Sequence, residues 1–262
     1  MAETVKVILD AGHGGPEPGA TYYGRQEKTD TLKLTLAVGN ILAQNGIDVV
    51  YTRVTDVFNT PYEKAQIANR SGADYFVSIH RNAMPVPGTA SGAETLVYTD
   101  SGVPGLMARN INSALESAGF ANLGVIERPG LVVLRRTEMP AVLLEAGFID
   151  NEADNQFFDR NFEAVARAIA DGILNTVREE QQACPRYYQI QTGVFRNEQA
   201  ASRQLDELQS QGYPAFLVHA DGLYKVRVGA YLNLDNAAQM ERQLKNSGYN
   251  TFLVRESDVY CH

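Results

Sequence analysis

Tryptophan is absent from this 262-residue chain, which also contains only two cysteines and four histidines. Two cysteines are too few for a disulfide-stapled scaffold or a cysteine-rich metal cluster. No apolar run approaches the roughly 20 residues that cross a bilayer, so the sequence predicts a soluble chain without a membrane span. Positive charge is also scarce, with 23 Lys and Arg against 31 Asp and Glu, and this balance argues against the basic surface on which nucleic-acid binding depends.

The first residues lack the features of a secretory leader. Residues 1–4 run directly into the strand-like residues 5–10, without a basic n-region or an apolar h-region. Either the protein is made without a leader or a leader has been removed, and the sequence leaves both possibilities open.

Residues 1–178 alternate short β-rich runs with amphipathic helical stretches. This alternation predicts an α/β fold, a mainly parallel sheet with helices on both faces. The expected strands are 5–10, 47–51, 75–79, 94–98 and 141–144, and the expected helices are 28–45, 61–71, 103–118 and 161–178.

The remainder of the chain has a different organisation. Residues 179–186 are polar, end in a Pro-Arg pair and read as a linker. Beyond them, Tyr188–Gly193 matches Tyr224–Gly229 at an offset of 36 residues, and the match continues through helix and strand positions. Two strand–helix–strand copies predict a second α+β domain over 187–262, with βαββαβ order and both helices on one face of an antiparallel sheet.

Charge is divided unequally between the two predicted domains. Residues 1–178 carry 15 Lys and Arg against 21 Asp and Glu, whereas residues 187–262 carry seven Lys and Arg against eight Asp and Glu. A nearly neutral surface rich in Tyr and Gln suits an uncharged polar polymer better than a phosphate backbone.

Two of the four histidines follow predicted strands. His13 lies in a glycine-rich turn after residues 5–10, and His80 ends the apolar run that begins at Tyr75. Ligands of open α/β sheets bind at the carboxyl ends of strands, so both positions are candidates for a site. A turn histidine without function remains the alternative for His13.

Two glutamates complete the candidate set. Glu145 directly follows four apolar strand residues, where an unpaired buried carboxylate is costly, although it could simply cap the next turn. Glu27 starts a predicted helix, where an acidic residue also complements the helix dipole. Two histidines and a carboxylate can bind Zn²⁺ with one open position for an activated water, and a further carboxylate can transfer its proton to a leaving amine.

The motifs that carry these residues resemble the Amidase_3 type of zinc-dependent N-acetylmuramoyl-L-alanine amidase. In order they are Asp-Ala-Gly-His13-Gly-Gly, Glu27, Ser-Ile-His80-Arg-Asn82-Ala and Leu-Leu-Glu145-Ala-Gly-Phe-Ile-Asp-Asn, within residues 5–177. The resemblance implies zinc held by His13, Glu27 and His80, Glu145 as general acid/base, and Asn82 near the substrate. The implied reaction is hydrolysis of the amide between N-acetylmuramic acid and the L-alanine of the peptidoglycan stem peptide.

The chain departs from this family's pattern at one position. Thr31 stands where many members have asparagine, so the resemblance assigns it no role. The connection Thr99–Pro104 is also too short for the inhibitory helix that some members insert there, so no autoinhibition of that kind is expected.

Residues 187–255 resemble a SPOR domain, a peptidoglycan-binding module. The resemblance implies binding of glycan strands that lack stem peptides, with Gln189, Gln191, Tyr224 and Arg227 as sheet-face candidates. In βαββαβ topology the first and last strands are neighbours, so a disulfide between Cys184 and Cys261 is a hypothesis, and two free thiols are the alternative.

The sequence therefore predicts a two-domain enzyme that acts at the bacterial cell wall. Two alternatives remain: a wall-binding protein without turnover, and a zinc peptidase that acts on free peptides. The sequence also leaves three settings open, namely a phage endolysin, a mother-cell autolysin of sporulation and a trimmed secreted enzyme.

Overall fold

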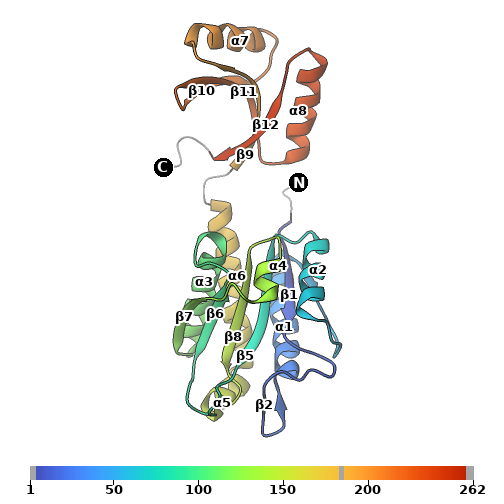
Figure 1. Cartoon of the computed structure of the whole chain (residues 1–262), viewed down its shortest axis with the longest axis vertical. Coiled ribbons are helices and arrows are strands. Elements are labelled where there is room, and N and C mark those ends of the chain that lie inside the picture. Colours follow the sequence, from blue (N-terminus) through green and yellow to red (C-terminus); the bar gives the residue numbers. More distant parts are fainter. Residues whose placement is uncertain (1–3, 183–185, 258–262) are drawn as a thin grey trace. The chain divides into compact units, whose positions relative to one another are not determined.

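The computed structural model describes residues 4–182 and 186–257, which belong to two compact units, Met1–Glu180 and Gln181–His262 (Figure 1). Each unit has its own hydrophobic core. Within these described ranges, no helix is both long and apolar enough to cross a membrane.

The first unit is built on a six-stranded sheet. Its strand order is β4-β1-β5-β8-β6-β7, and all neighbours are parallel except β6 and β8, which are antiparallel. The predicted α/β fold with a mainly parallel sheet is confirmed. The strands are β1 (Lys6–Ala11), β4 (Asp48–Tyr51), β5 (Tyr75–Asn82), β6 (Ala93–Val97), β7 (Asn122–Glu127) and β8 (Ala141–Phe148).

Helices cover both faces of this sheet because the side chains of successive strand residues point to opposite sides. Val7 and Leu9 pack with α1 (Glu27–Gln44), α3 (Gly102–Ala118) and α6 (Phe162–Gln182). Ile8 lies between them in the sequence and packs instead with α2 (Pro61–Ser71) and α4 (Val132–Arg136). The short hairpin β2 (Thr21–Tyr22) and β3 (Arg25–Gln26) precedes α1, and α5 (Glu152–Arg160) follows β8.

Helix α2 shows how local sequence sets an element's ends. The Thr60 hydroxyl accepts from the Glu63 N–H while the Glu63 side chain accepts from the Thr60 N–H, which forms a capping box. Pro61 occupies the first turn, where its missing N–H costs nothing, and Gly72 ends the helix in the left-handed region at φ +65°.

Several element ends differ from the sequence expectations. β5 continues to Asn82 and β8 to Phe148, because backbone pairing carries these strands through their polar residues. Helix α6 extends to Gln182, so the first four residues of the expected linker are helical. β7, α4 and α5 were not predicted from the apolar pattern. β6 ends at Val97 and α3 begins at Gly102, which leaves no room between them for an inserted helix.

The second unit is an antiparallel sheet of order β10-β11-β9-β12. Helices α7 and α8 pack on one face of it around a core that includes Ile190 and Val226, as predicted from the repeat. The predicted pairing of the first strand with the last is observed between β9 and β12. Cys184 and Cys261 lie outside the described residues. The elements are β9 (Arg186–Phe195), α7 (Glu198–Ser210), β10 (Ala215–Ala220), β11 (Leu223–Tyr231), α8 (Leu234–Asn246) and β12 (Phe252–Ser257).

Candidate metal centre

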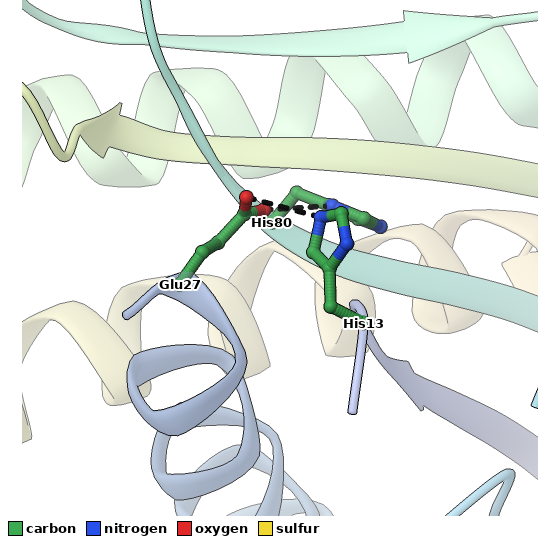
Figure 2. Close-up of side chains that lie close together, drawn as sticks. All are labelled: His13, Glu27 and His80. Atoms are coloured by element: carbon green, nitrogen blue, oxygen red, sulfur yellow. Dashed lines mark hydrogen bonds and ion pairs between the residues drawn. The ribbon is translucent and has the colours of Figure 1, made fainter. Parts of the chain in front are cut away.

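Three side chains from separate elements meet at the carboxyl ends of β1 and β5. His13 lies in the turn after β1, Glu27 is the first residue of α1, and His80 lies near the end of β5 (Figure 2). His13 Nε2 is 3.0 Å from Glu27 Oε2, and His80 Nδ1 is 2.8 Å from Glu27 Oε1. One ligand atom from each residue lies within 4.8 Å of the other two, so the three can hold a metal ion.

Glu27 is the buried centre of this group, with 3% of its surface exposed. The backbone N–H groups of Ala20 and Arg81 donate to its two carboxylate oxygens. Burial alone would raise its pKa, but the contacts with His13 and His80 outweigh that effect and hold the pKa of Glu27 well below its usual range. Glu27 is therefore an ionised carboxylate whose orientation the backbone fixes.

The donor set and its surroundings fit a metal ion. Two imidazoles and one carboxylate, with a position left open, form the pattern of catalytic zinc sites. Two glycines make room for the side chains: a Cβ on Gly12 would lie 2.5 Å from the His80 ring, and one on Gly19 would lie 2.5 Å from both Glu27 and His13. The three candidate ligands thus pack against backbone that carries no side chain.

The Gly12→Ala variant tests this packing. The backbone of Gly12 is outside the left-handed region, so the added methyl acts only by pushing the His80 ring away from its position. We expect affinity for Zn²⁺ to fall about 10-fold or more, as when groups that support metal ligands are changed, measured by chelator competition. Gly130→Ala is the matched control, because a Cβ there meets nothing within 4 Å. Equal affinity in the two variants would contradict the packing argument.

Glu145 lies on β8 beside this centre. In the strand register it lies opposite His80 of β5 on one side and opposite Glu94 of β6 on the other. Its Oε2 is buried and has no hydrogen-bond partner among the described residues. Burial first, and then the charges of Glu27 and Glu94, raise the pKa of Glu145 well above its usual range. An unpartnered carboxyl with a raised pKa next to metal ligands has the properties of a general acid/base.

Asn82 and Glu94 extend the polar edge beyond Glu145. The Asn82 amide donates to Glu94 Oε1 at 2.8 Å, and both residues are half-buried. Asn82, expected near the substrate, therefore holds the carboxylate of Glu94, which lies opposite the acid/base candidate Glu145.

A cavity of about 460 Å³ borders His13 and His80. Its walls are mainly apolar and come from the loop before α2 and from α4, including Phe58, Leu131 and Val132. Three charged groups also line it: Asp10 and Lys64 pair with each other at 2.9 Å, and Glu17 lies 3.7 Å from His13 Nδ1. Away from Glu17, the cavity therefore offers a mainly apolar surface next to the candidate metal ligands.

The structure adds four residues that sequence reasoning did not assign. Thr31, which the family pattern left without a role, donates from its hydroxyl to the carbonyl of Gly12. Arg53 and Lys64 also donate to the backbone that leads into His13, and Glu94 faces Glu145. The rule that identified His13 and His80 could have found Arg53, since it follows β4, a parallel strand of the same sheet.

The sheet-face candidates of the second unit separate by strand register. Tyr188 and Ile190 face the helices, so Gln189 and Gln191 point to the helix-free face, as does Arg227, which pairs with Gln191. The Arg227 Nη1 donates to Gln189 Oε1 at 2.8 Å, and both side chains are buried, which leaves Gln191 more exposed. Tyr224 instead packs against the core on the helix side and stacks on His219, so the expected position of Tyr224 on the open face is wrong.

Comparison with known families gives a match for each unit. Residues 7–175 match the Amidase_3 family, described as N-acetylmuramoyl-L-alanine amidase, and residues 185–255 match the SPOR domain.

Individual relatives agree with the family matches. The sporulation-specific N-acetylmuramoyl-L-alanine amidase of Bacillus subtilis is 33% identical over 223 residues, which is 83% of this chain and 86% of that protein. The endolysin of Bacillus phage SPP1 is 36% identical over 194 residues, 69% of this chain and 70% of that protein. A solved N-acetylmuramoyl-L-alanine amidase from Clostridium difficile 630 superposes with a TM-score of 0.64 at 31% identity, covering 68% of this chain and 98% of that one.

Proposed function

The chain belongs to the Amidase_3 family of N-acetylmuramoyl-L-alanine amidases and carries a SPOR domain, and from this premise we propose how its own residues perform the reaction. It is a peptidoglycan amidase that acts at the bacterial cell wall. The proposal is that His13, Glu27 and His80 hold Zn²⁺ and that Glu145 is the general acid/base. The observation that carries it is the convergence of these three ligands beside the unpartnered Glu145 carboxyl.

When bound, zinc supplies Lewis-acid chemistry that polarises a carbonyl and makes water nucleophilic near neutral pH. Glu145 accepts the proton that the attacking water loses and delivers it to the amide nitrogen as the C–N bond breaks. The products are the carboxyl group of the lactyl ether on muramic acid and a stem peptide with a free L-alanine amine. Glu27, held by two backbone N–H groups, keeps its orientation throughout.

The second unit is proposed to bind denuded glycan on its helix-free face. Gln189, Gln191 and Arg227 lie on that face, and the predicted domain 187–262 is nearly neutral, with seven Lys and Arg against eight Asp and Glu, which suits an uncharged sugar polymer. We assign catalysis to residues 1–178, the linker to 179–186 and wall binding to 187–262.

Deletion of residues 181–262 tests this division of roles. We expect hydrolysis of purified sacculi to fall about 10-fold, because a second binding module raises the local concentration of enzyme on the polymer. Hydrolysis of a soluble muramyl peptide should keep its kcat and KM, because the catalytic unit has its own core. Equal losses on both substrates would contradict the assignment.

A further inference from the structure

One buried arginine contacts both chain segments that carry the first two metal-ligand candidates. Arg53 follows β4 and has 3% of its surface exposed. Its Nε donates to the carbonyl of Ala11 at 3.1 Å, and its Nη2 donates to the carbonyls of Gly12 at 2.8 Å and Lys28 at 2.9 Å. Ala11 and Gly12 directly precede His13, and Lys28 directly follows Glu27.

The turn that carries His13 needs such support. His13 itself has φ +60°, a left-handed conformation that costs a non-glycine residue roughly 1–2 kcal/mol. Two further side chains hold the same backbone: the Thr31 hydroxyl donates to the Gly12 carbonyl and Lys64 Nζ donates to the Ala11 carbonyl, each at 2.8 Å. Side chains from α1, from α2 and from the segment after β4 thus converge on two consecutive carbonyl groups.

Arginine suits this position better than lysine. Its planar guanidinium presents several N–H donors in fixed directions, whereas an ammonium group is a compact point charge. Burial disfavours the charged guanidinium and lowers the pKa of Arg53, and the nearby charges of Asp10 and Asp56 only partly offset this. Burying a cation costs free energy, and the described hydrogen bonds of Arg53 go mainly to backbone carbonyls. A role for Arg53 is therefore expected in the segments that carry those carbonyls, next to His13 and Glu27.

We propose that Arg53 is a positioning residue of the metal centre, which fixes His13 relative to Glu27 by tying together the backbone next to each. The inference rests on the proposed metal-dependent function. Thr31 supports the same carbonyl from α1 and acts in the same direction with a smaller effect. The ligand distances are thus set from outside the ligand triad, by a residue that touches neither metal nor substrate.

The test measures Zn²⁺ affinity of the full-length chain by chelator competition. Arg53→Lys keeps the positive charge but loses the planar set of N–H donors. We expect the affinity of this variant for Zn²⁺ to fall about 10- to 100-fold, the range for groups that orient metal ligands. Thr31→Val keeps the buried shape, removes the hydroxyl and should lose a few-fold to about 10-fold. Raising free Zn²⁺ should restore most amidase activity to both variants.

The control for general destabilisation is Leu115→Ala in α3, a fully buried position in a core cluster that includes none of the three candidate ligands. It should lower the melting temperature and leave Zn²⁺ affinity unchanged. Wild-type affinity in a folded Arg53→Lys chain, or an affinity loss no greater than that of Leu115→Ala at equal thermal stability, would overturn the proposal. If Arg53→Lys does not fold, unchanged affinity in Thr31→Val has the same consequence. A wild-type chain that hydrolyses muramyl amides without binding Zn²⁺ would instead overturn the proposed metal site.

Discussion

The Glu145→Gln variant is expected to bind Zn²⁺ as tightly as the wild type while its kcat falls about 10²- to 10⁴-fold, the contribution of a general acid/base. The amide has nearly the same shape as the carboxyl, so His80 on the neighbouring strand keeps its place. What the variant loses is the ability to take a proton from water and deliver it to the leaving nitrogen. Metal content and turnover on a muramyl peptide, measured on the same preparation, check both halves of the prediction.

The same substitution should raise the stability of the metal-free protein at neutral pH. The pKa of Glu145 is raised in the fold by burial and by Glu27 and Glu94. Below the unfolded-state pKa of about 4.3, the Glu145 carboxyl is protonated in both the folded and the unfolded chain and does not change the free energy of unfolding. Above that pH the carboxyl ionises more readily in the unfolded chain, so the free energy of unfolding falls as pH rises toward the folded-state pKa. Glutamine removes this penalty. Thermal unfolding in chelator should show a gain at pH 7 that disappears near pH 4.

Glu163→Gln is the matched control, an exposed glutamate in the first turn of α6. It should leave turnover, metal content and the pH dependence of stability unchanged. If Glu145→Gln loses its zinc, Glu145 is a ligand rather than an acid/base. If it retains turnover, another group moves the proton.

The second large effect is expected from Glu27→Gln. This change removes the only carboxylate of the ligand triad and the negative charge that faces His13 and His80. We expect bound zinc to fall from one ion per chain to almost none and amidase activity to fall at least about 10³-fold, because the metal supplies both polarisation and the nucleophile. Metal analysis after dialysis against buffer with trace zinc measures the first, and product release measures the second.

Glu17→Gln provides the comparison for Glu27→Gln. Glu17 is also acidic and lies 3.7 Å from His13 Nδ1, but its side chain is about half exposed. Its variant should keep zinc and most activity. Full zinc content in Glu27→Gln would remove Glu27 from the ligand set, and equal loss in both variants would attribute the effect to general charge near His13.

Ligands of open α/β sheets bind at the carboxyl ends of strands, and this explains which site residues the sequence could reveal. His13 and His80 follow apolar runs that are parallel neighbours in the sheet, so their convergence follows from strand order alone. Glu94 could not be found in this way. Glu94 is the second residue of β6, and the beginning of this strand lies beside Glu145 only because β6 runs antiparallel to β8.

Other differences also have physical causes. Thr31 was set aside because a family pattern has another residue there, yet its hydroxyl bonds to a carbonyl that no sequence pattern indicates. Tyr224 was a sheet-face candidate of the SPOR resemblance, but the alternation of β11, with Val226 and Val228 in the core, turns it toward the helices. Helix α4 spans only Val132–Arg136, too short to show a helical period.

The most direct test of the account is product analysis on purified peptidoglycan sacculi, with and without a zinc chelator. The account predicts free stem peptides that begin with an unblocked L-alanine, glycan strands with intact lactyl ethers, and no release once chelator is added, with recovery on adding Zn²⁺. Cleavage within the peptides, or release that continues unchanged in chelator, would contradict it.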